Sequence, residues 1–268
     1  MSGMNARVHI EKGEHVAHVI LSRPKKYNAL DMQAFEELMA AGEAIKVDSS
    51  VRAVVLSGEG DNFCAGLDLA SFAGELATAE NFSERALKLA AGEKANFFQK
   101  PAYVWKELNV PVIAALDGVV YGGGCQIALA ADIRIASPKT RMSVMEIKWG
   151  LIPDMAITQT LPQLVRQDVA MELVLTGRIV DAEEALAIGL VTRLAENPVR
   201  AAMELAKQIA ARSPDATSRA KRLLQTGWSL DAAQGLRLEA TLQAEIMARP
   251  NQLEAVVSNR EKREPVFQ

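Results

Sequence analysis

The stretch VIAALDGVVYGGGCQ, residues 112–126, decides how this chain folds and where its chemistry lies. Residues 112–116 are apolar and predict a buried strand, and the glycines at 122–124 open an Ala- and Leu-rich helix over residues 123–131. Each glycine costs about 0.5–1 kcal/mol relative to alanine inside regular structure. A run of three is therefore expected where the backbone approaches another group closely or turns sharply.

The start of this predicted helix suits an oxygen that gains negative charge. Backbone N–H groups in a first helical turn have no partner inside the helix and carry partial positive charge. Further along, Glu146 stands among Met142, Met145 and Ile147, which predict an apolar pocket. Burial raises the pKa of a carboxyl group, so that it can exchange protons near neutral pH. Asp154 is either a helix N-cap or a second acid–base group.

Composition excludes several classes of protein. The chain has 268 residues, 49% hydrophobic content and a net charge of −3, which fits one large globular body and makes nucleic acid a poor partner. The three histidines lie in the first 18 residues, which argues against a catalytic triad or a metal site. Cys64 and Cys125 have no metal-type spacing and are expected to be reduced. With neither a secretory signal nor a membrane span in view, we expect a cytoplasmic protein without a membrane partner.

Strands alternate with helices over residues 1–197, and residues 198–268 predict helices only. We expect strands at 15–21, 51–57, 112–116, 132–136 and 141–146. We expect helices from residue 32 behind an Asp31 cap and over residues 154–161, 167–176 and 181–188. The boundary near Asn197 and Pro198 separates an α/β body from a helical region.

A set of motifs now carries a resemblance to a known family. Its first part is Arg23-Pro24-x-x-x-Asn28-Ala29-Leu30, Phe63-Cys64-Ala65-Gly66-x-Asp68-Leu69 and Gly122-Gly123-Gly124-Cys125. Its second part is Ala131-Asp132-Ile133-Arg134, Gly150-Leu151-Ile152-Pro153, Leu175-Thr176-Gly177 and Ala182-x-x-Ala185-x-x-x-Gly189-Leu190-Val191. Over roughly residues 8–268 the chain resembles the enoyl-CoA hydratase/isomerase (crotonase) family.

The resemblance implies an α/β fold, ligand and assembly that composition alone does not give. It implies a crotonase-like spiral of β-β-α repeats, a C-terminal α-helical region that forms a homotrimer or a dimer of trimers, and an acyl-CoA ligand. Coenzyme A is then part of the substrate, and no cofactor is expected. The N–H groups of Leu67 and Gly123 would form an oxyanion hole, and Glu146 would be a catalytic carboxylate. The ordinary alternatives are a strand-to-loop turn and a solvated glutamate at a strand edge.

Gln126 is where the chain departs from the family's hydratases, which hold a second glutamate at this position. Glutamine is nearly isosteric with glutamate but does not exchange protons under ordinary conditions. Three explanations remain open. In the first, the protein is natural and uses Glu146 with Asp154, which favours isomerisation. In the second, it uses Glu146 alone on an unusual substrate. In the third, Gln126 is an engineered Glu→Gln change.

Further residues take expected roles by the same resemblance. Lys25 and Lys26 would contact the phosphates of coenzyme A, or else lie in a solvated turn. The other predicted substrate contacts are Ala65, Asp68, Leu69, Gly122 and Trp149, where Trp149 is pocket wall or core. Lys262 and Phe267 would reach a neighbouring subunit's site. Apolar residues would shape the acyl tunnel: Phe72, Leu76, Phe97, Phe98 and Trp105.

Two classes of function remain in view. The first is an enzyme that acts on fatty acyl-CoA thioesters through an enolate, either a hydratase (a lyase) or an enoyl- or dienoyl-CoA isomerase. The second is a catalytically weakened acyl-CoA-binding or scaffolding member, with which Gln126 is consistent. The expected pocket around Glu146 favours the enzyme.

Overall fold

A six-stranded sheet forms the centre of the body in the computed structural model, which describes residues 6–75 and 79–268. The first two strands pair antiparallel and all further neighbours pair parallel. Continuous apolar runs explain the buried central strands, because a parallel sheet is covered on both faces. The order across the sheet is β1 (Val8–Gly13), β2 (Val16–Leu21), β3 (Ala53–Gly58), β4 (Val112–Leu116), β6 (Ile133–Ala136) and β9 (Arg193–Leu194).

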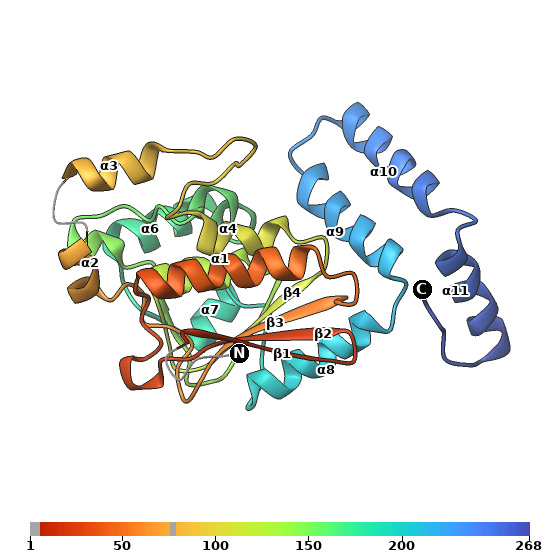
Figure 1. Cartoon of the computed structure of the whole chain (residues 1–268), viewed down its shortest axis with the longest axis horizontal. Helices are drawn as coiled ribbons and strands as arrows, with labels where there is room; N and C mark the ends of the chain where they lie inside the picture. Colours follow the sequence, from red (N-terminus) through yellow and green to blue (C-terminus); the bar gives the residue numbers. More distant parts are fainter. Residues whose placement is uncertain (1–5, 76–78) are drawn as a thin grey trace.

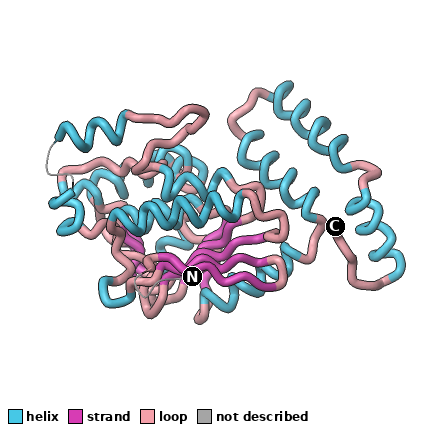
Figure 2. Tube along the Cα trace, in the orientation of Figure 1, coloured by secondary structure: helices cyan, strands magenta, loops and turns pink. Residues whose placement is uncertain are grey.

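Helices cover both faces of this sheet (Figures 1 and 2). On one face, α1 (Met32–Lys46) and α4 (Lys100–Glu107) pack in the larger apolar cluster. On the other face, α8 (Pro198–Ala210) packs small side chains against β2, β3 and β4. Asp31 caps α1 by accepting a hydrogen bond from the N–H of Ala34, which confirms the predicted cap.

A small second sheet brings the glycine run to the body's edge. It consists of β5 (Val119–Tyr121), β7 (Arg141–Ser143) and β8 (Val180–Asp181), with β7 in the middle. Helix α5 (Gly123–Ala130) starts directly after β5. The remaining helices of the body are α2 (Leu69–Glu75), α3 (Ala79–Leu87), α6 (Gln167–Thr176) and α7 (Ala182–Ile188), with 3-10 turns at Pro24–Lys26, Glu146–Trp149, Ile157–Gln159 and Leu161–Gln163.

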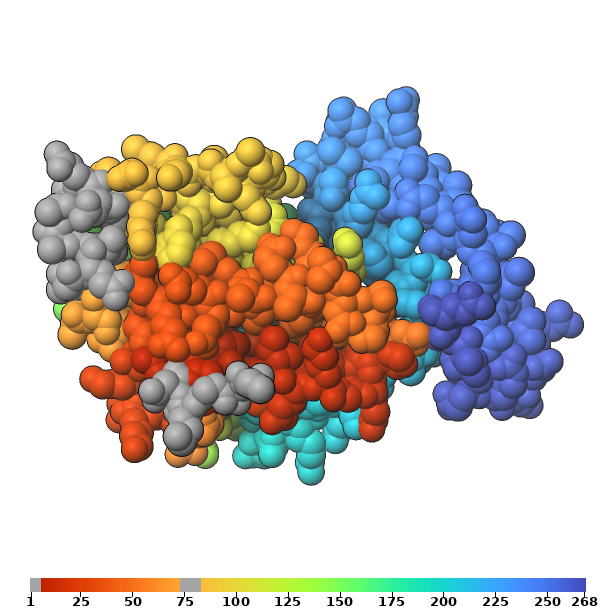
Figure 3. All heavy atoms as spheres, in the orientation of Figure 1, coloured from red at the N-terminus to blue at the C-terminus, as the bar shows by residue number. Residues whose placement is uncertain are grey.

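Three helices form an arm beside the body, coloured blue in Figures 1 and 3. They are α9 (Pro214–Gly227), α10 (Ala232–Ile246) and α11 (Pro250–Glu261). The buried Lys221 of α9 fixes the arm, because its Nζ lies 2.8 Å from a carboxylate oxygen of Asp132 at the start of β6. At the chain's end, the carbonyl of Phe267 accepts a hydrogen bond from Arg52. Contact of Phe267 or Lys262 with a neighbouring subunit stays a prediction.

Two predicted elements are wrong. Residues 154–161 do not form one helix, because Ala156 adopts a left-handed backbone with φ of 63° and only 3-10 turns follow. Asp154 lies in an irregular segment and caps no helix. The strand expected over 141–146 stops at Ser143, and Glu146 begins a 3-10 turn.

The division at residue 197 follows the last strand, but α8 beyond it still belongs to the packing of the sheet. A trimerisation role for residues 198–268 stays a prediction. Within residues 6–75 and 79–268, no helix has the length and apolar character that a bilayer crossing requires.

Candidate active site

Two loops that are distant in sequence meet beside β5. The first loop is residues 22–31, between β2 and α1, and the second is residues 59–68, between β3 and α2. The carbonyl of Tyr27 accepts a hydrogen bond from the N–H of Ala65 at 2.9 Å. Leu30 then pairs with the turn in both directions, donating to the carbonyl of Gly66 and accepting from the N–H of Asp68, each at 2.8 Å. These bonds hold the turn at residues 65–68 against the first loop, as a short strand-like bridge would.

The same turn lies against the glycine run. Gly122 has φ of 51°, a left-handed conformation that glycine adopts without strain. A Cβ added at Gly122 would stand 3.5 Å from Oε1 of Glu146 and 3.9 Å from the Cα of Gly66. These are ordinary van der Waals distances, so the left-handed backbone, and not a lack of space, explains the glycine at this position.

Two backbone donors at this junction are unused. In the described part of the chain, the N–H groups of Leu67 and Gly123 have no acceptor. Gly123 is the first residue of α5, where an N–H has no partner within the helix and the helix dipole favours negative charge. Both N–H groups are available to an acceptor, and their joint role as an oxyanion hole stays a prediction.

Gln126 and Glu146 are in direct contact. The side-chain amide of Gln126 donates from Nε2 to Oε1 of Glu146 at 2.6 Å, and its Oε1 accepts from the N–H of Met155 at 2.8 Å. Gln126 is 1% exposed and Glu146 is 8% exposed. Glu146 is therefore not a solvated strand-edge residue.

One carboxylate oxygen of Glu146 is free. Oε2 is covered from solvent and finds no hydrogen-bond partner among the described residues. Burial is the main reason that the pKa of Glu146 lies above its usual range, and the negative charge of Asp154 adds to the rise. The hydrogen bond from Gln126 opposes it. A raised pKa and a free oxygen are the properties of a group that takes up and returns a proton.

Asp154 lies at the surface, but its negative charge still raises the pKa of Glu146. Its side chain is exposed, and partial desolvation raises its pKa as well. The structure thus brings Gln126, Glu146 and Met155 into one hydrogen-bonded group and leaves Asp154 at its edge.

The remaining predicted substrate contacts differ in exposure and in their partners. Desolvation would raise the pKa of Asp68, but the hydrogen bond and charge of Arg23, 2.9 Å away, outweigh it and hold the pKa below its usual range. Lys25 and Lys26 are exposed and form no ion pair with any described residue. Leu69 begins α2, and Trp149 is 61% exposed, so its assignment to the core is wrong.

The aromatic residues expected to shape an acyl tunnel mostly fill space. Phe72, Phe97 and Phe98 all pack around Phe35, with ring centroids 5.4–6.4 Å from its ring. Trp105 is fully buried and donates to the carbonyl of Pro101. Leu76 lies outside the described residues.

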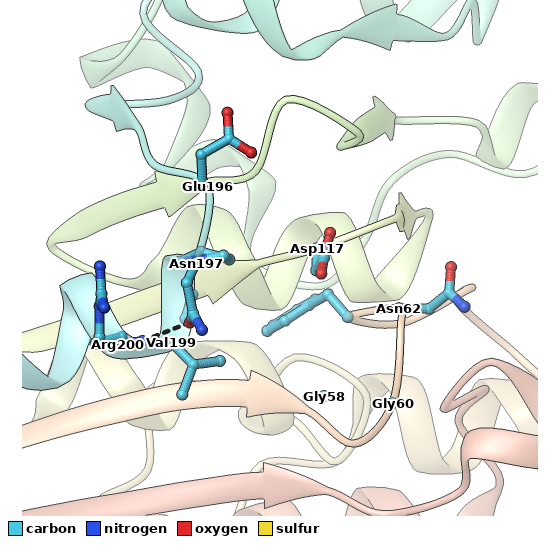
Figure 4. A pocket seen from close by; sticks show the side chains of 11 residues that line it. Gly58, Gly60, Asn62, Asp117, Glu196, Asn197, Val199 and Arg200 are labelled. Carbon is cyan, nitrogen blue, oxygen red and sulfur yellow. Dashed lines mark hydrogen bonds between the residues drawn. The ribbon is translucent and has the colours of Figure 1, made fainter.

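A separate hollow of about 430 Å³ opens at the carboxyl ends of β3 and β4 (Figure 4). Asn62 and Asp117 line one side, and the first turn of α8 lines the other. The Asn197 side chain already accepts from the N–H of Arg200, so the helix start is capped. None of the predicted site residues lines this hollow.

Other catalytic arrangements find little support in the described residues. His18 Nε2 lies 2.8 Å from Oγ of Ser57, but Ser57 is buried within β3. No group of three or more His, Cys, Asp or Glu side chains in the described ranges is arranged to hold a metal ion.

Sequence reasoning missed the backbone N–H of Met155 and the Arg23 side chain. Met155 orients Gln126, and Arg23 fixes Asp68. Neither contact has a signal in local sequence pattern, because both join segments brought together only by the fold.

Comparison with known proteins shows which family and which fold the chain resembles. Residues 11–268 match the family model described as enoyl-CoA hydratase/isomerase. The chain is 33% identical to methylglutaconyl-CoA hydratase, mitochondrial, of Mus musculus, covering 97% of this chain and 82% of that one. It is 34% identical to the short-chain-enoyl-CoA hydratase of Clostridium acetobutylicum, covering 95% and 94%.

Solved structures confirm the predicted fold. The structure superposes on an enoyl-CoA hydratase from Bacillus anthracis with a TM-score of 0.89 and 30% identity, over 97% of this chain and 98% of that one. One from Streptomyces coelicolor, described as a putative enoyl-CoA hydratase, gives the same TM-score at 32% identity, over 100% and 96%. The crotonase-like arrangement of β-β-α units followed by a helical region is therefore confirmed.

Proposed function

Because the chain belongs to the enoyl-CoA hydratase/isomerase family, we propose that it moves a proton at the acyl group of an acyl-CoA thioester, with Glu146 as its acid–base group. The main support is the covered Oε2 of Glu146, which has no hydrogen-bond partner among the described residues. The unused amides of Leu67 and Gly123 add to it. A substrate reaches this oxygen by displacing the side chains that cover it.

In the proposed reaction, the thioester oxygen accepts hydrogen bonds from Leu67 and Gly123. The carboxylate of Glu146 takes a proton from C2, and the electron pair of that C–H bond moves toward the thioester oxygen as an enolate forms. Each oxyanion donor contributes about 3–4 kcal/mol to stabilising such an intermediate. Glu146 then returns the proton to carbon, which regenerates the carboxylate.

Gln126 shapes which reaction follows. Its oxygen is held by Met155 and one amide hydrogen by Glu146, so it fixes the Glu146 carboxylate without exchanging a proton itself. Migration of a double bond needs one base that moves a proton between C2 and C4. We therefore propose double-bond isomerisation as the first reaction of the chain as it stands.

Hydration is the second candidate, because relatives with about one third identity are named hydratases. Glu146 would then take a proton from water while the oxygen adds to C3, with C2 protonated in return. Gln126 retains one amide hydrogen that can position this water. Asp154 would supply a second proton-exchanging group from the edge of the site.

The coenzyme A part of the substrate is expected to contact the two lysines of the first loop. Lys25 and Lys26 are exposed on the first loop, which is hydrogen-bonded to the turn at residues 65–68. They would attract the phosphates of coenzyme A. We also propose that the protein assembles through its C-terminal helices into a homotrimer or a dimer of trimers, that it is cytoplasmic, and that it needs no cofactor beyond the coenzyme A of the substrate.

The test compares the wild-type chain with Gln126→Glu on a trans-3-enoyl-CoA and a trans-2-enoyl-CoA, with products identified by mass and retention time. Double-bond migration by the wild type, and hydration gained in the variant, would support the proposal. Binding of acyl-CoA without turnover of either substrate by either protein would contradict it and favour a binding member of the family.

A further inference from the structure

The thiol of Cys64 contacts every segment that builds the proposed oxyanion site. Its Sγ donates to the carbonyl of Asn28 at 3.1 Å, in the first loop. The same sulfur accepts a longer hydrogen bond, 3.4 Å, from the N–H of Gly66, one residue before Leu67. The side chain is fully buried.

The Cys64 side chain also limits how closely the start of α5 can approach the turn at residues 65–68. A Cβ added at Gly124 would lie 2.7 Å from the sulfur and 2.6 Å from the Cβ of Cys64, which is closer than side chains pack. Gly124 follows Gly123, the second proposed donor. The helix start therefore rests directly on the Cys64 side chain.

The backbone of Cys64 leaves the side chain little freedom. Its N–H donates to the carbonyl of Val119 at 3.0 Å, and its carbonyl accepts from the N–H of Tyr121 at 2.9 Å. Because both bonds join it to β5, the sulfur occupies a fixed position between the turn and the helix.

The thiol is not a nucleophile. Desolvation raises the pKa of Cys64 to about 12, so the group stays neutral and keeps its hydrogen. A neutral thiol can both donate to Asn28 and accept from Gly66, which a methyl group in its place cannot.

We infer that Cys64 is a positioning residue: its buried thiol sets the separation and direction of the Leu67 and Gly123 amides. The inference rests on the proposed function for its catalytic consequence, but the placement of the two amides can be observed without substrate. Misplacement of reacting groups on the scale of an ångström changes rates by about a hundredfold, so a smaller shift is expected to cost about tenfold.

The experiment compares Cys64→Ala, Cys64→Ser and Cys64→Thr with the wild type. Alanine removes both hydrogen bonds, threonine adds a methyl group against Gly124, and serine keeps a donor and an acceptor. Val55→Ala is the control for lost stability, because Val55 is fully buried under α8 on the other face of the sheet. The amide signals of Leu67 and Gly123 are followed by ¹⁵N NMR, and kcat and KM are measured on an enoyl-CoA.

We expect alanine and threonine to shift both amide signals and to lower kcat about tenfold, with KM within about threefold. Serine and the Val55 control should stay near the wild type in both readouts. Unmoved amide signals, or an unchanged kcat despite moved signals, would overturn the inference. If Cys64→Ala does not fold, the same two measurements on Cys64→Thr test the inference. A wild type without activity but with amides that respond to Cys64 would contradict the proposed function alone.

Discussion

Replacing Gln126 with glutamate would bring two carboxyl groups into contact inside the protein. In the present structure, Nε2 of Gln126 lies 2.6 Å from Oε1 of Glu146, and residue 126 is 1% exposed. A glutamate of the same shape would place an oxygen where the donating nitrogen now stands. The attraction between the two side chains would become a repulsion.

The loss of stability can be calculated for two states of the pair, one with both carboxyl groups ionised and one with a single carboxyl group protonated. Two unit charges about 4 Å apart, at an effective dielectric constant of about 20, repel by about 4 kcal/mol. Keeping one carboxyl protonated at pH 7 instead, when its ordinary pKa is about 4.3, costs about 1.4 kcal/mol per pH unit, or about 4 kcal/mol. Both routes predict a loss of stability of up to about 4 kcal/mol at pH 7.

The sign of the pH dependence is fixed by the raised pKa. The folded variant keeps a proton on the pair of carboxyl groups that the unfolded chain releases above about pH 4.3. Its free energy of unfolding therefore falls as the pH rises from about 4.3 to the raised pKa of the folded pair. Urea unfolding of Gln126→Glu and of the wild type should therefore give similar free energies near pH 4 and diverge toward pH 7.

The swapped double variant Gln126→Glu/Glu146→Gln is the matched control. It keeps one carboxyl and one amide in contact, and Met155 can still donate to residue 126. Its stability should stay within about 1 kcal/mol of the wild type across this pH range. A stability difference between Gln126→Glu and the wild type that is the same at pH 4 and pH 7 would refute the contact.

Three further predictions concern neighbouring groups. Asp154→Asn should move the acid limb of the activity profile to lower pH, because the Asp154 charge raises the pKa of Glu146; an unmoved limb would show that the charges are not coupled. Gly124→Ala should destabilise the fold by about 1–3 kcal/mol through its clash with Cys64, measured by urea unfolding, and an unchanged midpoint would contradict the close packing. Lys221→Met should cost about 2 kcal/mol, because it removes the ion pair of the partly buried Asp132 carboxylate where α9 joins the body and leaves only hydrogen bonds from Val112 and Gln225; a neutral effect would mean that the ion pair does not fix the arm.

Sequence pattern predicted the regular elements well where local signals agree. The strand at 112–116 and the helix at 167–176 have the predicted bounds. In the helix predicted over residues 181–188, Asp181 is the N-cap and accepts from the N–H of Glu184. In each case an apolar period and an end signal favour one structure. The three-residue strand β5 was not predicted, because its pairing partner β7 lies twenty residues away.

The catalytic roles of the site residues stay predictions, and the contacts between these residues were not predicted from the sequence. The glycine run and Glu146 have patterns that suggest chemistry, and the structure brings both together. The orientation of Gln126 depends on Met155, and the packing of Gly124 depends on Cys64. Such contacts arise from tertiary structure, which periodicity and capping rules do not describe. Asp154 was misread as a possible cap for the same reason, since a left-handed residue at 156 ends the expected helix.

The proposed reaction requires Glu146 to exchange a proton with the acyl chain. Incorporation of solvent deuterium at C2 of a trans-3-enoyl-CoA, followed by mass spectrometry, measures this step directly, whether or not a product is released. We predict incorporation by the wild type that falls at least about a hundredfold in Glu146→Gln, with acyl-CoA affinity within about threefold. Equal incorporation by the wild type and Glu146→Gln would contradict the account.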